Sequence, residues 1–354
     1  MKLSSCERRM GDSVRLGPFQ LEHPFILAPM AGITTSPYRR LMRRHRAALV
    51  ISELVSAHGI EYSGQRSLDL LRFHEEERIV GLQIFGEDLK LLCKASQWVE
   101  KLGADFVDLN LGCPVPKVVK KGAGSALCRD PLWLGQILTA MVKSVQIPVT
   151  IKIRIGWDAE SKNAWDVVQA ATDAGVSWVA VHGRTRSQGY SGFADWDFMG
   201  DLKAKSSIPI VGNGDLTTPE LALEKLKKYG MDAVMVGRGA LRNPFIFEQA
   251  ECLWRRGEGQ GQKPLSGEDY SSWLQEQRTL LEEVYEPRVA MIHARKWIAW
   301  SSAGFQGCHE FRRLVFSTSD PETLWAESKI FFEKKTQARD LQFLAQPFLM
   351  GGHG

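Results

Sequence analysis

One pattern recurs eight times in the first two thirds of the chain: a short apolar run rich in β-branched residues, followed by a longer amphipathic segment with helical spacing. Runs that lack polar alternation indicate strands buried on both faces, as in parallel sheets connected by helices. The eight runs are residues 25–30, 49–55, 79–86, 106–112, 149–154, 178–183, 208–215 and 233–239. Eight such units in about 230 residues predict an α/β fold, a (β/α)8 TIM barrel.

An open, doubly wound sheet is the alternative architecture for the same repeat. Such sheets carry a G-x-G-x-x-G turn after the first strand when they bind dinucleotides. Here the first predicted strand ends in Ala-Pro-Met-Ala-Gly, residues 28–32, which lacks that fingerprint. The barrel is therefore the favoured interpretation.

The strand pattern stops near residue 250, and four long helical patterns follow a polar, glycine-rich segment. Such a composition is typical of a linker. We predict five regions: an N-terminal extension (1–15), a barrel domain (16–250), a linker (251–267), a small helical domain (268–342) and a tail (343–354).

Composition excludes several classes of protein. With 44% apolar and 24% charged residues, and with no run of roughly 20 apolar residues, the chain is expected to be cytoplasmic and to lack a membrane segment. Its six cysteines are scattered and form no C-x-x-C pair, so we expect neither a disulfide framework nor a metal site. A monomer is the default expectation.

Polar residues and glycines gather where the predicted strands end. Barrel enzymes place their reactive groups at these carboxyl ends. Any one such residue has an ordinary structural explanation, but their coincidence on one rim predicts an active site. The candidates are Pro29, Met30, Ala31, Gln83, Asn110, Cys113, Lys152, Arg154, His182, Arg184, Arg186, Asn213, Gly214, Asp215, Gly237 and Arg238.

The last two strand ends indicate a phosphate-bearing cofactor. They continue as Gly-Asn-Gly-Asp (212–215) and Gly-Arg-Gly (237–239), and glycines let backbone N–H groups approach an anion closely. A buried Lys152 would stabilise negative charge on a reduced flavin ring. Gln83 offers a donor and an acceptor to the polar edge of such a ring.

Several of these segments resemble the flavin-dependent tRNA-dihydrouridine synthases, and most closely their general bacterial branch. The resemblance runs from about Phe25 to Ile246 and continues more weakly at residues 294–300. The combination of Asn-x-Gly-Cys-Pro with His-Gly-Arg-Thr-Arg is its most specific part. The matching segments are APMAGIT (28–34), LQIFG (82–86), DLNLGCPVPKVVKKGAGSAL (108–127), TIKIRIGW (150–157), HGRTRSQGYSG (182–192), GNGD (212–215) and GRGALRNP (237–244).

The resemblance implies a cofactor, a reductant and a catalytic acid. FMN would lie across the barrel mouth and be reduced by NADPH, with hydride then passing to C6 of a uridine. Cys113 would donate the proton to C5, Asn110 would help hold the base or the flavin, and Arg154 would contact the substrate tRNA. The FMN contacts implied are Pro29, Met30, Ala31, Gln83, Lys152, His182, Asn213, Gly214, Asp215, Gly237 and Arg238.

The implied substrate is tRNA, whose target uridine must leave its stack to reach a barrel mouth. Basic residues would then contact phosphates. The candidates are Lys117, Lys120, Lys121, Arg184, Arg186, Arg295 and Lys296. A separate arginine cluster at residues 39–46 has two interpretations, a solvated helix face or a part of the same groove.

Two other functions are compatible with these residues. One is a flavin enzyme that reduces or oxidises a free pyrimidine, as the dihydroorotate and dihydropyrimidine dehydrogenases do. It would need neither the helical region nor the basic rim. The other is an RNA-binding protein that keeps the fold without turnover, against which the presence of Cys113, Lys152 and His182 argues.

Overall fold

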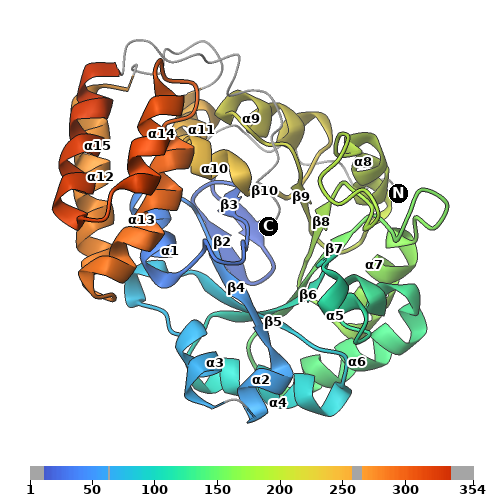
Figure 1. Ribbon diagram of the computed structural model, residues 1–354. Helices are drawn as coiled ribbons and strands as arrows, with labels where there is room; N and C mark the ends of the chain where they lie inside the picture. Colours follow the sequence, from blue (N-terminus) through green and yellow to red (C-terminus); the bar gives the residue numbers. More distant parts are fainter. Residues whose placement is uncertain (1–11, 63, 257–264, 336–354) are drawn as a thin grey trace.

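The computed structural model describes residues 12–62, 64–256 and 265–335, and its centre is a barrel of eight parallel strands surrounded by helices (Figure 1). Each of the eight predicted runs contains one strand, which confirms the TIM-barrel prediction. The strands are β3 (Phe25–Leu27), β4 (Val50–Ser56), β5 (Val80–Phe85), β6 (Phe106–Leu111), β7 (Val149–Arg154), β8 (Val179–His182), β9 (Ile210–Asn213) and β10 (Ala233–Val236).

The strand order closes the sheet into a ring. Neighbours follow the order β3, β10, β9, β8, β7, β6, β5, β4, and each neighbouring pair in this series is parallel. The two ends of this series meet, because the Leu27 N–H donates to the Leu49 carbonyl at 2.9 Å and the Ala48 N–H donates to the Phe25 carbonyl at 3.0 Å. All carboxyl ends therefore lie at one mouth.

Side-chain alternation along the strands divides the barrel interior from the helix-facing surface. On β7, Ile151 and Ile153 pack in the outer core against helices, so Thr150, Lys152 and Arg154 point into the barrel. The interior near the amino ends of the strands is apolar, whereas the polar residues occupy its upper part. The barrel interior thus becomes more polar toward the mouth.

A hairpin covers the amino-terminal end of the barrel. Strands β1 (Val14–Leu16) and β2 (Phe19–Leu21) pair in antiparallel fashion, and their Leu16 and Leu21 pack with Phe106 and Trp178 in one buried cluster. The predicted boundary between residues 15 and 16 falls inside β1, since Val14 and Arg15 already belong to that strand. Residues 1–11 of the predicted extension lie outside the described residues.

Helices follow the strands and cover the outside of the barrel. Several begin at a side-chain cap: the Asp130 carboxylate accepts from the Trp133 N–H at 3.0 Å, and Pro131 occupies the first helical position. The helices are α1 (Ser36–Arg44), α2 (Ala57–Tyr62), α3 (Gln65–Leu70), η1 (Glu75–Glu77), α4 (Leu89–Lys101), α5 (Pro116–Val119), η2 (Gly124–Arg129), α6 (Pro131–Ser144), α7 (Ala164–Ala174), α8 (Trp196–Lys205), α9 (Pro219–Lys228), α10 (Arg238–Arg242) and α11 (Ile246–Arg256).

Four further helices stand beside the barrel, next to α1, α10 and α11 (Figure 1). They are α12 (Gly267–Glu282), α13 (Pro287–Ser301), α14 (Cys308–Ser317) and α15 (Pro321–Lys335). The predicted linker, residues 251–267, overlaps both neighbouring helices, because α11 continues to Arg256 and α12 begins at Gly267. Residues 257–264 of the linker and the tail 343–354 lie outside the described residues. None of the described helices is long and apolar enough to cross a membrane.

Arg39 and Arg40 of the arginine cluster at residues 39–46 are buried and serve the fold, whereas Arg44 and Arg46 are exposed. Arg39 is 1% exposed and its Nε lies 2.5 Å from the Glu77 carboxylate, which is 0% exposed. Arg40 bridges Glu76 and Glu283, the latter at 2.6 Å. These arginines therefore join α1 to η1 and to the end of α12.

The Arg39–Glu77 pair predicts a large effect on stability. Glu77→Gln leaves the Arg39 charge buried without its partner, so we expect the free energy of unfolding to fall by about 3–5 kcal/mol. Urea denaturation followed by circular dichroism measures this change. The matched control is Glu75→Gln on the same turn, whose partner Arg78 is a surface residue. Equal effects of the two substitutions would contradict the prediction.

Candidate active site

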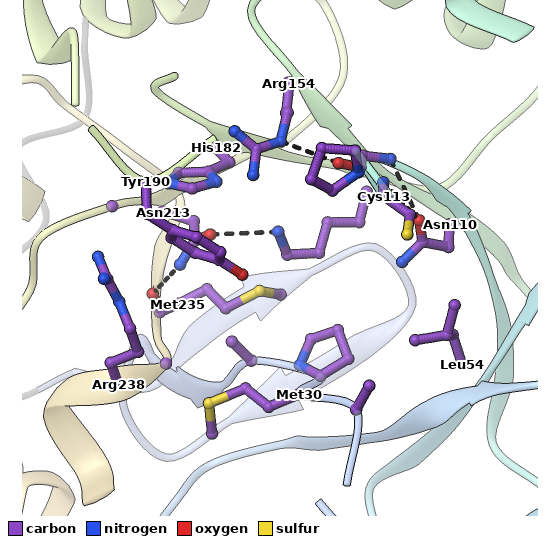
Figure 2. A pocket seen from close by; sticks show the side chains of 18 of the residues that line it. Met30, Leu54, Asn110, Cys113, Arg154, His182, Tyr190, Asn213, Met235 and Arg238 are labelled. Atoms are coloured by element: carbon purple, nitrogen blue, oxygen red, sulfur yellow. Dashed lines mark hydrogen bonds between the residues drawn. The ribbon is translucent and has the colours of Figure 1, made fainter. Parts of the chain in front are cut away.

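A cavity of about 320 Å³ opens at the carboxyl ends of the strands and gathers most of the predicted site (Figure 2). Figure 2 shows its labelled side chains arranged around one space, with Cys113 and Asn110 on one side and Arg238 opposite. The predicted residues that line it are Pro29, Met30, Ala31, Gln83, Asn110, Cys113, Lys152, Arg154, His182, Asn213, Gly214, Asp215, Gly237 and Arg238.

The residues predicted to contact tRNA lie mainly outside this cavity. Three exposed lysines, Lys117, Lys120 and Lys121, lie on and just after α5, which follows the Cys113 loop. Lys296 extends from α13 to the Gly32 carbonyl, at 3.4 Å from its Nζ. Arg186 and Arg295 are partly exposed, and the Nε of each is buried without a hydrogen-bond partner.

The loop that carries Cys113 is fixed by side chains on both sides. The Asn110 Oδ1 accepts from the Cys113 N–H at 2.9 Å, and the Ser125 hydroxyl donates to the Cys113 carbonyl at 3.0 Å. Gly124 has a φ of +62°, and a Cβ there would lie 3.1 Å from that carbonyl. The thiol is half-buried, and burial raises its pKa, so it is protonated at neutral pH.

Lys152 is held inside the mouth, and none of the carboxylates in the described part of the chain pairs with it directly. Its Nζ donates to the Asn213 Oδ1 at 3.2 Å, and the Asn213 amide donates in turn to the Met235 carbonyl at 2.7 Å (Figure 2). Burial lowers the pKa of Lys152 to about 8, with a smaller contribution from Arg154 in the same direction. Its ammonium has donors left for a ligand.

A buried chain of hydrogen bonds supports this region from below. The Gln83 amide donates to Asp108 at 2.6 Å, and the Asn110 amide donates to the Gln83 oxygen at 2.8 Å. The Thr150 hydroxyl donates to the other Asp108 oxygen at 2.6 Å. Gln83 and Asn110 are therefore already engaged with protein groups, and each retains one amide N–H for the cavity.

Arg154 links two loops at the mouth and still presents a free nitrogen. Its Nε donates to the Gly112 carbonyl at 2.9 Å, and its Nη1 donates to the carbonyls of Thr185 and Gly189 at 2.9 and 2.8 Å. Nη2 has no partner within the described part of the chain. Burial lowers the pKa of Arg154 to about 10, which leaves the guanidinium charged at neutral pH.

Arg184, which the sequence analysis predicted as a tRNA contact, is a buried side chain that holds a loop in place. It is 0% exposed, and its Nη2 pairs with Asp215 at 2.8 Å. Its Nε and Nη2 also donate to the carbonyls of Ser191 and Gly192 at 3.1 and 2.6 Å. Asp215 accepts from the Ala194 N–H at 2.8 Å, so the pair fastens the loop after β8 to the end of β9.

That loop carries Tyr190, a cavity residue that the sequence interpretation missed. The guanidinium carbons of Arg238 and Arg154 lie 4.7 and 5.7 Å from the centre of its ring. No spacing rule separates this tyrosine from other loop residues, since its position depends on the Arg184–Asp215 pair. Leu54 and Met235 also line the cavity and lacked a signal because each lies within an ordinary apolar run.

His182 is neutral in this environment. Burial, followed by the nearby cations Arg154, Lys152, Arg184 and Arg238, holds its pKa well below the usual range. Gly214 lies beside it with a φ of +136°, and a Cβ there would come within 2.5 Å of Ala194 and 3.3 Å of the His182 ring. Only glycine fits at this strand end.

The charges of the site suit an anionic organic ligand. Lys152, Arg154 and Arg238 face the cavity, while the Asp215 carboxylate is shared by Arg184 and Arg238. In the part of the chain that the structure describes, no three His, Cys, Asp or Glu residues are placed to hold a metal ion.

Comparison with known proteins identifies the family. The family model for dihydrouridine synthases (Dus) matches residues 26–338. The chain belongs to the dihydrouridine synthase family. This match covers the barrel and the helices beside it, so the cavity and the basic loops around its mouth lie within the matched region.

Individual relatives support the same family assignment. The tRNA-dihydrouridine synthase B of Pseudomonas aeruginosa is 38% identical over 322 residues, which cover 91% of this chain and 96% of that protein. The tRNA-dihydrouridine synthase B of Pseudomonas putida is 38% identical over 333 residues, which cover 93% and 97%. A probable tRNA-dihydrouridine synthase of Rickettsia bellii is 37% identical, with 87% and 94% covered.

Solved structures agree on the fold. Histamine dehydrogenase from Rhizobium sp. 4-9 superposes with a TM-score of 0.54 at 13% identity, over 68% of this chain and 47% of that chain. The 6-hydroxypseudooxynicotine amine oxidase from Pseudomonas geniculata N1 gives a TM-score of 0.55 at 13% identity, over 70% and 49%. The dihydrouridine synthase chain thus spans about half the length of these structures.

The buried ammonium predicts a measurable cost in stability. Because the pKa of Lys152 is lower in the folded chain than in the unfolded chain, its contribution to the unfolding free energy rises as pH increases from about 8 to 10.5. We expect Lys152→Met to stabilise the cofactor-free protein at pH 7 by about 1–3 kcal/mol. The gain should shrink toward pH 10, as measured by urea denaturation across this range. A gain independent of pH would contradict the predicted cause.

Proposed function

We propose that this chain is an FMN-dependent tRNA-dihydrouridine synthase, which reduces the C5=C6 bond of a specific uridine in tRNA with NADPH as the reductant. The observation that carries the proposal is the protonated, half-buried thiol of Cys113, which shares one cavity with the buried ammonium of Lys152. Family membership supports the reaction class.

The residues present fit FMN. The cavity offers unneutralised donors at Lys152, a cation at Arg238, and strand ends at Gly214 and Gly237 whose backbone a ligand can approach. Lys152 and His182 would hold the ring system, while the loops after β9 and β10 would hold the phosphate. Pro29, Met30 and Ala31 supply the apolar wall beneath it.

When bound and reduced by NADPH, FMN supplies the hydride that C6 of the uracil receives. The Cys113 thiol then completes the reaction: its S–H bond breaks, a C–H bond forms at C5, and a thiolate remains. Because burial raises the pKa of Cys113, the thiolate regains a proton from solvent readily at neutral pH. The Asn110 hydrogen bond to the Cys113 N–H fixes where the thiol stands during this transfer.

Two cations orient the base. The free Nη2 of Arg154 can donate to a uracil carbonyl, and Lys152 stabilises negative charge that develops as hydride arrives. Tyr190 narrows the entrance beside them. The exposed Lys117, Lys120 and Lys121 follow the Cys113 loop and are suited to phosphates around a flipped-out uridine.

The role of Cys113 predicts a selective defect. Cys113→Ala should retain flavin and tRNA binding, because the loop is fixed by backbone and Asn110 contacts, while losing at least about a hundredfold in dihydrouridine formation. Mass spectrometry of tRNA fragments measures the product. The matched control is Cys308→Ala, which removes a thiol at the start of α14, far along the chain from the cavity. Full activity in Cys113→Ala would rule out the proposed proton donor.

The substrate class is tested under anaerobic conditions. The purified protein is reduced with NADPH and mixed with tRNA from cells that lack this activity, and flavin reoxidation is followed. We expect reoxidation together with a mass gain of two hydrogens at one uridine, and neither result with free uridine. Reoxidation by a free pyrimidine, with the tRNA unchanged, would instead establish a small-molecule dehydrogenase.

A further inference from the structure

Two arginine side chains lie over one tryptophan ring outside the reaction cavity. The guanidinium carbons of Arg129 and Arg186 are each 4.7 Å from the ring centre of Trp157. Stacking of this kind holds a guanidinium in place and leaves its N–H edge available to acceptors. Among the described residues neither guanidinium pairs with a carboxylate, and the Arg186 Nε has no hydrogen-bond partner.

The topology places this Arg129–Trp157–Arg186 stack on the face that carries the cavity. Arg129 ends η2, which follows β6, while Trp157 follows β7 and Arg186 follows β8. Since the carboxyl ends of parallel barrel strands meet at one mouth, all three residues belong to loops of that mouth. The stack therefore lies beside the entrance, on the side formed by β6, β7 and β8.

Backbone contacts hold the three loops together. The Arg186 N–H donates to the Gly156 carbonyl, and the Ser187 N–H donates to the Trp157 carbonyl, both at 2.9 Å. The Asn163 amide donates to the Cys128 carbonyl at 2.6 Å. The stack is consequently ordered before any ligand arrives, which lowers the entropic cost of binding.

The stack carries two positive charges and therefore suits an anionic ligand. Two like charges over one ring repel each other, and nearby carboxylates are used elsewhere: Asp130 caps α6, and Asp195 caps α8 and pairs with Lys162. Asp158 makes no ion pair with either arginine. The exposed Lys117, Lys120 and Lys121 precede η2 in the same loop after β6, so positive charge continues along this side.

We propose that Arg129, Trp157 and Arg186 form a second tRNA contact, at which the two guanidiniums bind backbone phosphates outside the reaction cavity. This inference rests on the proposed function, since tRNA is the substrate there. A polyanion with repeated phosphates matches a fixed pair of cations followed by a row of lysines. Trp157 acts as the platform that sets the position of both arginines.

The test measures tRNA binding to the flavin-loaded protein by fluorescence anisotropy at several salt concentrations. Arg129→Gln and Arg186→Gln should each weaken binding about three- to tenfold and reduce the slope of log K against log salt by about one. Trp157→Phe should keep most of the affinity, whereas Trp157→Leu should lose it. The matched control is Lys205→Gln. The Lys205 Nζ also lies over a tryptophan ring, 4.5 Å from the centre of Trp165, but this pair is at the end of α8 that is remote from the mouth.

A second arm separates tRNA from the reductant, because NADPH also carries phosphates. The rate of flavin reduction by NADPH without tRNA should be unchanged in the arginine variants. Slower reduction with unchanged tRNA affinity would overturn the inference, as would arginine variants that bind tRNA like the wild type. If the wild-type protein binds and modifies tRNA and the arginine variants bind tRNA equally well, only the proposed second contact is refuted. A wild-type protein that leaves tRNA unmodified would refute the proposed function.

Discussion

The two-residue period of the barrel strands is the constraint on which the site depends. In β5, β6 and β7, alternate residues face the interior, so Gln83, Asp108, Asn110, Lys152 and Arg154 all point inward while their neighbours pack under the helices. If any of these strands shifted its pairing by one residue, its polar side chains would turn toward the helices and its apolar side chains would turn into the barrel. The register that pairs Asn110 with Lys152 thus fixes catalytic geometry and packing together.

The upper barrel concentrates polar groups whose burial is unfavourable. Lys152, His182 and Asp108 all have pKa values displaced toward their neutral forms by burial. The lower barrel offsets this cost, because the hairpin residues Leu16 and Leu21 complete an apolar cluster there. The amino-terminal end of the barrel therefore stabilises the fold, whereas the carboxyl-terminal end is suited to bind and react with a ligand.

The fold and the contents of the cavity could be predicted from the sequence because both depend on local pattern: apolar runs give strands, and strand ends meet at one mouth. Ion pairs between residues that are distant in the sequence could not be predicted. Arg39 and Arg184 are indistinguishable in sequence from surface arginines until Glu77 and Asp215 are placed beside them. The end of α11 was missed because the glycines that follow Arg256 gave the whole segment the composition of a linker, although its first turns have apolar residues to bury.

The basic side chains at residues 40–46, on and just after α1, have a consequence for how the chain is made. Arg40 pairs with Glu283, Arg46 with Glu251 and His45 with Glu248, all of them more than 200 residues downstream. On the ribosome, the first βα unit therefore emerges with basic side chains whose partners have not been synthesised. Strand β3 likewise lacks one of its two neighbours until β10 has been synthesised. The barrel cannot close on this side until β10 has left the exit tunnel, so its first and last strands are completed together.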